Sequence, residues 1–410
     1  MATKSPAPRL SDEQRFDWLR LARSENVGPR TFRALIENCG GARSALEALP
    51  ELARRGGVAR PIRVASEREI EREFGAAHRI GVRFIAFGEP GYPPLLRQVD
   101  AAPPILALRG TEAALQRPAV AIVGSRNASA AGLIMADRLA RGLGQAGYAV
   151  VSGLARGIDQ RAHVASLDTG AIGVLAGGHA KPYPEDAAPL IERMVVSGAV
   201  VSEMPIEWMP RGQDFPRRNR IVSGLALGAI VVEAARRSGS LITARRALDQ
   251  NRLVFAVPGS PLDPRAEGTN DLLRQGATIC TSVDDVLSAL EPLLASDLFS
   301  SLAEARHQPA PLSSEQSLFA DDSGAATRDQ HDEEFDDSDG AARIGADGGE
   351  RRERILALLG PSPISLDELT RAAETSTRDV RIALLELELA GRLEYFGGDR
   401  VALRGIADDV

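Results

Sequence analysis

The stretch 215–224, with the sequence FPRRNRIVSG, concentrates positive charge at the start of a predicted helix. Arg217, Arg218 and Arg220 fall within four residues, at the point where apolar residues at helical spacing begin. Pro216 suits a first helical turn, because its missing N–H would have no partner there. Cations at this end of a helix face the positive pole of its dipole, which is unfavourable unless an anion lies among them. We therefore predict an anion site here, with phosphate as the anion.

Other loops that follow predicted strands have a similar composition. Most combine glycine or serine with an arginine or lysine. Glycine lets a ligand approach the backbone closely, and the N–H groups at a helix start bind anions. Taken singly, each loop also fits a tight turn or a helix cap without a ligand, whereas several at the same strand ends favour a polyanion site. The predicted phosphate-binding residues are Gly124, Ser125, Arg126, Ser152, Gly153, Arg156, Gly157, Lys181, Arg217, Arg218, Asn219, Arg220, Ser238, Gly239 and Ser240.

Two of these loops leave alternatives open. Lys181 and Tyr183 suit single-stranded nucleic acid, where stacking of a base on a ring contributes about 1–3 kcal/mol; alternatively, Tyr183 packs under a loop fixed by prolines. Asp159 either caps the helix that follows it or pairs with an arginine. His163, four residues later on the same helix face, fits a packing residue better than a base.

Seven runs rich in Val, Ile and Ala are the predicted strands, and helical segments separate them. Continuous apolar runs indicate strands that are buried on both faces, and the alternation with helices indicates a parallel, doubly wound α/β sheet. In such sheets ligands bind beyond the carboxyl ends of the strands, where the loops named above lie. The predicted strands cover residues 119–124, 148–153, 171–177, 199–203, 228–233, 253–258 and 278–281.

The predicted fold class is α/β, with a Rossmann-like, mainly parallel sheet flanked by two smaller domains. Segment 27–41, VGPRTFRALIENCGG, resembles the helix-hairpin-helix and SAM-like families, whose hairpins bind DNA backbone or mediate protein contacts. The predicted segments are a disordered tail (1–10), a helical SAM-like domain (11–72), an extension packed on the next domain (73–116), the Rossmann-like domain (117–294), an acidic flexible linker (295–350) and a winged-helix domain (351–405).

The winged-helix pattern consists of three helices followed by a hairpin near residue 397. Acidic side chains repel DNA phosphates, so a role in protein contacts fits its recognition helix at least as well as groove reading. The charged residues on that helix include Arg378, Asp379, Arg381, Glu386 and Glu388.

The composition bounds the class of protein. A chain of 410 residues with 44% hydrophobic content predicts two or three packed domains. The formal charge is −7, but residues 321–350 hold eleven acids and two arginines, so the remainder is slightly basic and a nucleic-acid partner stays possible. Cys39 and Cys280 lack metal-ligand spacing, which excludes a thiolate zinc site and a disulfide scaffold. Without a signal sequence or a long apolar run, we expect a cytoplasmic protein with no membrane insertion.

No catalytic motif stands out. The first loop lacks the GxGxxG spacing of dinucleotide sites, and the chain has no Walker A motif, no Ser-His-Asp set and no metal-ligand cluster among its five histidines. We therefore expect no cofactor, no metal and no enzymatic activity.

Six motifs together resemble the DNA-processing protein A family (DprA, also called Smf). The likeness covers the α/β domain in order and extends to YPPLLRQVDAAPPILALRG before it. The motifs are VAIVGSR at 120–126, SGLARGID at 152–159, FPRRNRIVSGL at 215–225, VVEA with SGSLITA at 231–244, FAVPG at 255–259 and EGTNDLLRQGA at 267–277.

The resemblance implies a dimeric protein that binds single-stranded DNA, protects the incoming strand during natural transformation or recombination, and loads RecA recombinase on it. It also implies that the basic pocket of the Rossmann-like domain holds the strand. The likeness is closest at Arg126 and the PRRNR segment and looser at Lys181.

Two other functions remain as alternatives. The fold also resembles nucleotide phosphoribohydrolases of the LONELY GUY type, but the segment SGSLITARRALD lacks their catalytic Glu, and Glu203 and Glu233 stand alone at strand ends. A sequence-specific regulator that reads DNA through its winged helix is disfavoured by the acids of that helix.

Overall fold

The computed structural model describes residues 9–57, 60–295, 352–396 and 399–404, which divide into two compact units. Of these residues, 9–15 and 67–295 belong to the first unit, and the others belong to the second. Most of the predicted tail and almost all of the predicted acidic linker lie outside the described residues.

Within the described residues, the first unit is built on a nine-stranded sheet. The seven strands β3 to β9 are parallel to one another, whereas β2 pairs antiparallel with β1 and β6. In spatial order the strands are β1 (Arg83–Ala86), β2 (Ile105–Gly110), β6 (Ala199–Ser202), β5 (Ala171–Val174), β4 (Ala149–Ser152), β3 (Ala119–Val123), β7 (Gly228–Val231), β8 (Leu253–Ala256) and β9 (Thr278–Ile279).

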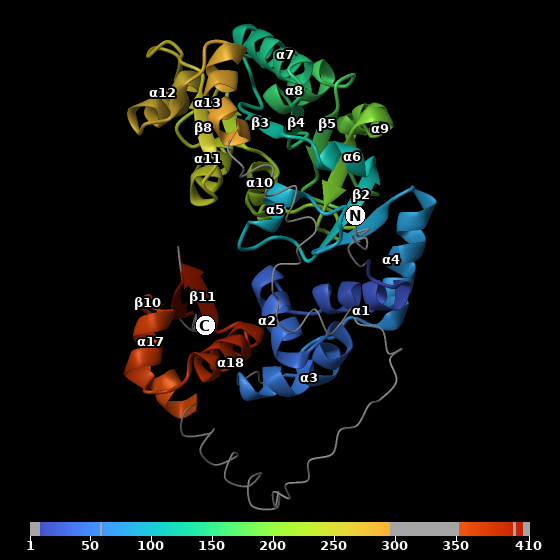
Figure 1. Cartoon of the computed structure of the whole chain (residues 1–410), viewed down its shortest axis with the longest axis vertical. Helices are drawn as coiled ribbons and strands as arrows, with labels where there is room; N and C mark the ends of the chain where they lie inside the picture. Colours follow the sequence, from blue (N-terminus) through green and yellow to red (C-terminus); the bar gives the residue numbers. More distant parts are fainter. Residues whose placement is uncertain (1–8, 58–59, 296–351, 397–398, 405–410) are drawn as a thin grey trace, which may run out of the picture. The chain divides into compact units, whose positions relative to one another are not determined.

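Helices cover both faces of this sheet. Helices α7 and α8 pack on one face and α10 and α11 on the other (Figure 1). The helices are α4 (Glu67–Arg79), α5 (Pro94–Arg97), α6 (Glu112–Leu115), α7 (Ala130–Gln145), α8 (Ile158–Ala165), α9 (Ala188–Ser197), α10 (Asp214–Gly224), α11 (Ser240–Asp249), α12 (Glu267–Arg274) and α13 (Val283–Ala295), with 3₁₀ turns at Glu185–Ala187 and Pro264–Ala266.

The apolar runs of the strands supply buried clusters on both faces of the sheet. In β3, Val120 and Ile122 pack with α7, α8 and α13, whereas Ala119, Ala121 and Val123 pack with α10 and α11. Because alternate side chains of a strand point to opposite faces, both sets must be apolar, which explains why the runs are continuous rather than alternating.

The second unit combines the N-terminal helical domain with the winged-helix domain. Local signals set its helix ends: Pro29 begins α2, Gly40 ends it with a left-handed φ of 77°, and Ser365 and Glu368 form a capping box on α17. Its elements are α1 (Asp12–Ala22, which begins in the first unit), α2 (Pro29–Cys39), α3 (Ala42–Arg55), a helical segment at 352–358, β10 (Ile364–Ser365), α17 (Leu366–Ala373), α18 (Thr377–Leu389), β11 (Leu393–Phe396) and β12 (Arg400–Leu403).

The predicted fold class is confirmed, and each predicted strand of the α/β domain overlaps an observed one. Two boundaries differ from the prediction. Segment 73–116 is no mere extension, because it supplies β1 and β2 to the sheet itself. At the N-terminus, Leu10 is buried and its N–H donates to the carboxylate of Glu89 at 3.1 Å, so order begins before residue 11.

Candidate polyanion-binding site

A cavity of about 710 Å³ lies at the carboxyl ends of β3, β4 and β7. Four of the predicted loops line it, so loops that are far apart in the sequence do converge at one place. Nine of the predicted residues lie in its wall: Gly124, Ser125, Arg126, Gly153, Arg218, Asn219, Ser238, Gly239 and Ser240.

Three of the remaining predicted residues have structural or peripheral positions. Ser152 is buried and donates its hydroxyl to the carbonyl of Ile122 at 2.6 Å. Gly157 has a φ of 79°, and a Cβ there would lie 2.4 Å from the carbonyl oxygen of Ser125, so glycine allows the second loop to pack on the first. Arg156 is exposed and pairs with Asp186 at 3.2 Å.

Arg218 is buried beneath the cavity. Its guanidinium donates to the carbonyl of Gly153 at 2.6 Å and to that of Val174, which ties the loops after β4 and β5 together. Burial lowers the pKa of Arg218 to about 10, with nearby Asp159 opposing the shift, so the side chain remains charged at neutral pH. Arg218 therefore holds the cavity's floor and adds positive charge from below.

The other two arginines of this cluster share one carboxylate. Glu203, at the end of β6, accepts from Arg217 at 3.1 Å and from Arg220. The Arg220 side chain is largely buried, whereas that of Arg217 is 49% exposed. Glu203 therefore supplies part of the negative charge that we had predicted a bound anion would bring to this cluster.

Helix α10 also begins earlier than predicted, at Asp214 rather than at Pro216. The carboxylate of Asp214 accepts from the indole N–H of Trp208 at 2.9 Å and from the backbone N–H of Arg211 at 2.7 Å. A buried acid in the first turn complements the helix dipole, so the arginine cluster does not stand alone at the positive pole.

Arg126 is the predicted cation most available to a ligand in the cavity. It is exposed, and it forms no ion pair with any carboxylate among the described residues. Its guanidinium lies 5.3 Å from the ring centroid of Phe215, and Tyr183, 50% exposed, meets the same ring edge-on at 5.6 Å. Arg126 and Phe215 thus adjoin each other in the cavity wall, and Tyr183 contacts the ring of Phe215.

Phe215 and Arg237 line the cavity, although the sequence did not single them out as site residues. Arg237 is exposed and directly precedes Ser238, so its position beside a predicted loop was the available signal. The hydroxyls of Ser238 and Ser240 lie 2.7 Å apart at the N-terminal end of α11, where the helix dipole favours an anion.

The strand-end carboxylates that could do acid–base chemistry have structural partners. Glu233 accepts from the backbone N–H of Ser129 at 2.9 Å and from its hydroxyl, which caps α7. Asp159 is buried and accepts from the backbone N–H of Gly153 at 3.1 Å; burial raises its pKa, and the charge of Arg218 opposes this. Within the described ranges, no three His, Cys, Asp or Glu side chains are grouped as metal ligands.

His163 has the packing role that we expected. It is fully buried, and burial lowers its pKa to about 3, so the imidazole is neutral at physiological pH.

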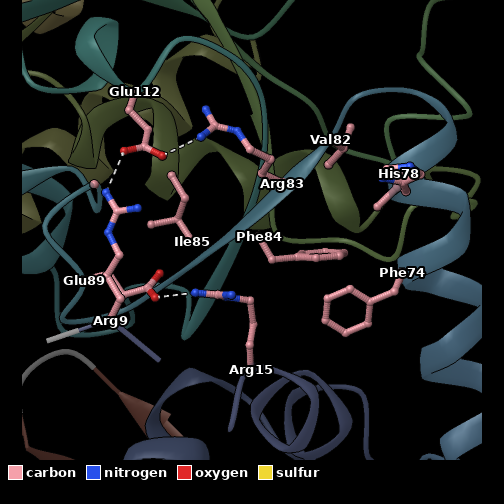
Figure 2. Close-up of a pocket in the computed structure, with 12 residues that line it drawn as sticks. Arg9, Arg15, Phe74, His78, Val82, Arg83, Phe84, Ile85, Glu89 and Glu112 are labelled. Carbon is pink, nitrogen blue, oxygen red and sulfur yellow. Dashed lines mark hydrogen bonds and ion pairs between the residues drawn. The ribbon is translucent and has the colours of Figure 1, made fainter. Parts of the chain in front are cut away.

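A second cavity, of about 300 Å³, lies between α4 and β1 and differs in its charges. Figure 2 shows Glu112 between Arg9 and Arg83, and Glu89 facing Arg15, whose ion pair with Glu89 measures 2.7 Å. Each arginine of this cavity has a carboxylate partner. This cavity is therefore less suited to bind a phosphate than the cavity beside Arg126.

Comparison with known proteins gives the same family for all three domains. Residues 83–291 match the family described as DNA recombination-mediator protein A. Residues 12–76 match the DprA-like N-terminal HHH domain, and residues 340–399 match the DprA winged helix domain.

Individual relatives agree with the family match. The chain is 39% identical to DNA processing protein DprA of Bacillus subtilis over 225 residues, which cover 54% of this chain and 76% of that protein. It is 36% identical to protein Smf of Escherichia coli over 319 residues, which cover 76% and 75%. The crystal structure of DNA processing protein A from Streptococcus pneumoniae superposes with a TM-score of 0.56 at 31% identity, covering 68% of this chain and 98% of that one.

No helix in the described part of the chain combines the length and the apolar character that crossing a bilayer requires.

Proposed function

Because the chain belongs to the DNA recombination-mediator protein A family, we propose that it binds single-stranded DNA in the cavity beside Arg126 and acts in DNA processing and recombination. The observation that supports this most is the convergence of four loops on one cavity whose exposed arginines, Arg126 and Arg237, have no ion-pair partner among the described residues.

In this proposal, phosphates bind to the two arginines and to the hydroxyls of Ser238 and Ser240, at the positive end of the α11 dipole. Tyr183 and Phe215 offer ring surface on which unpaired bases stack, which duplex DNA cannot use in the same way. Binding weakens as salt rises, because counterions released from the strand gain less entropy in a more concentrated salt solution.

Fluorescence anisotropy with a labelled oligonucleotide tests the site. We expect Arg126→Ala to bind a single strand roughly tenfold more weakly and to lower the slope of log affinity against log salt by about 1, because one charged contact to phosphate is lost. Arg141→Ala is the matched control, since Arg141 is an exposed arginine on α7 outside the cavity, paired with Asp137. Undiminished binding by a folded Arg126→Ala chain would refute the site.

We also propose that the protein loads RecA recombinase on the bound strand and works as a homodimer. The family resemblance supports both statements, and the sheet offers one suitable surface for a second copy: β9 forms an edge, and Ile279 on it is 52% exposed. Analytical ultracentrifugation tests the dimer: the Ile279→Arg chain should sediment more as a monomer than the parent chain does. Assembly of RecA on single strands tests the loading: the Arg126→Ala chain should fail to promote it.

We further propose that the protein is not an enzyme of the phosphoribohydrolase type. Glycoside hydrolysis needs placed carboxylates, and both Glu203 and Glu233 are engaged with structural partners. Incubation with adenosine 5′-monophosphate followed by chromatography is the test; release of free adenine above that of a Glu203→Gln, Glu233→Gln double variant would contradict the proposal.

A further inference from the structure

The recognition helix of the winged-helix domain, α18, packs against α2 and α3 of the N-terminal helical domain within the second unit. In winged-helix proteins that read DNA, this helix enters the major groove and must be open to solvent. Here Leu385, Glu386 and Leu389 of α18 are buried.

Hydrogen bonds run between the two domains. The side-chain amide of Asn26 donates to the carbonyl of Leu389 at 2.8 Å, and Arg392 donates to the carbonyl of Gly56 at 3.4 Å. Arg352 donates both to the carbonyl of Arg55 and to the carboxylate of Glu386, the latter at 2.8 Å. The contact is thus specified by polar groups as well as by apolar burial.

The hairpin of the helical domain faces the same contact. Residues 23–28 join α1 to α2, and Arg30 lies in the first turn of α2. This connection and the helix start that follows it are the part that would approach a DNA backbone in a helix-hairpin-helix domain. The guanidinium of Arg30 lies 4.7 Å from the ring centroid of Tyr395 on β11, and Tyr395 donates to Glu388 at 3.3 Å. The hairpin therefore engages the winged-helix domain at the place where it would engage DNA.

The acids of α18 suit this protein contact. On a groove-reading helix, Glu386 and Glu388 would repel phosphates, whereas here Glu386 is 2% exposed and paired with Arg352, and Glu388 lies near Arg30. We propose that α18 is a docking helix whose partner is the N-terminal helical domain of the same chain, so that two surfaces that bind DNA in other proteins cover each other.

Gly56 provides a precise test of this contact. A Cβ on Gly56 would lie 1.9 Å from the backbone carbonyl oxygen of Glu386, while its φ of −64° is one that any residue adopts. Gly56→Leu therefore acts as a wedge against α18 without straining its own backbone. Gly360→Ala is the control, because a Cβ there meets nothing within 4 Å.

The experiment uses the full chain with a protease site inserted between residues 325 and 326. After cleavage, the C-terminal piece should co-elute with the rest in size-exclusion chromatography at micromolar concentration, both in the parent chain and in Gly360→Ala. In Gly56→Leu it should separate. Separation of the parent pieces, or retention in a folded Gly56→Leu chain, overturns the proposal.

Two further arms keep the test decisive. If Gly56→Leu does not fold, Asn26→Gly removes the side-chain hydrogen bond to Leu389 and suits the left-handed φ of 58° at this position. Because the contact is then weaker, its pieces should already separate at a concentration at which the parent pieces still co-elute. Crosslinking of α18 to a second, tagged copy would overturn the intramolecular contact. A tenfold gain of duplex affinity in Gly56→Leu would show that α18 is a covered DNA reader rather than a docking helix.

Discussion

At the scale of single residues, the cluster FPRRNR contains side chains with different tasks. Arg218 is buried beneath the cavity, and Arg217 and Arg220 share Glu203. The sequence held a signal for the first of these, because Arg218 lies three, four and seven positions before Ile221, Val222 and Leu225 and so falls on the apolar stripe of the helix. The ion pairs of Arg217 and Arg220 with Glu203 could not be predicted from the local sequence, because Glu203 follows a different strand.

Removing the buried guanidinium should cost stability. Arg218→Ala leaves two carbonyls and the buried Asp159 without their cation, so we expect the free energy of unfolding to fall by about 3–5 kcal/mol. Urea denaturation followed by circular dichroism measures this. Arg217→Ala, whose side chain is half-exposed, should cost less than about 1 kcal/mol. Equal effects of the two substitutions would contradict the distinction.

At the scale of elements, the central strands were predictable because strands buried on both faces have continuous apolar runs. Strands β1 and β2 lie in a segment of short β-rich runs that we did not assign to the sheet, because prolines at 93–94 and 103–104 break the pattern between them. Their pairing is antiparallel and lies at the edge, where prolines in the connection cost no ladder hydrogen bonds. The convergence of the cavity loops could be predicted, because the carboxyl ends of parallel strands lie at the same edge of a sheet. The packing of α18 on the N-terminal helical domain could not, because it depends on contacts between residues distant in sequence.

The docking of α18 should respond to pH through Glu388. Burial raises the pKa of this carboxyl, opposed by Tyr395, Thr31 and Arg30 around it. Its contribution to the stability of the second unit is therefore full below the ordinary glutamate pKa and is lost as pH rises through the raised value. We expect Glu388→Gln to be more stable than the parent chain at pH 8 and equal to it near pH 4.

Thermal unfolding of the full chain at the two pH values measures the effect. Glu394→Gln, exposed on β11, is the control and should follow the parent chain at both. An unchanged pH dependence in Glu388→Gln would exclude this carboxyl as the cause.

At the scale of the whole molecule, net charge was misleading. The acidic excess of the chain is concentrated in residues 321–350, outside the described residues, while the cavity that we propose for DNA is lined by arginines of the first unit. Electrostatic attraction of a strand depends on such local charge rather than on the sum.

A chain that ends at residue 350 tests where binding resides. Because all residues of the proposed site belong to the first unit, we expect its affinity for a single strand to stay within about twofold of the parent chain, measured by anisotropy at matched salt. A loss of about tenfold would instead assign binding to the winged-helix domain and revive the regulator hypothesis.

Glu203 gives the proposed binding a further property. A carboxylate that already neutralises Arg217 and Arg220 acts as an internal counterion, so a strand that reaches these arginines exchanges one bound anion for another. Because one anion replaces another, these two arginines add little to the net positive charge that attracts the strand. When the strand leaves, Glu203 can pair with them again. The protein would then bind a strand tightly at a few phosphates and weakly at the others, which fits the proposed transfer of the strand to RecA recombinase.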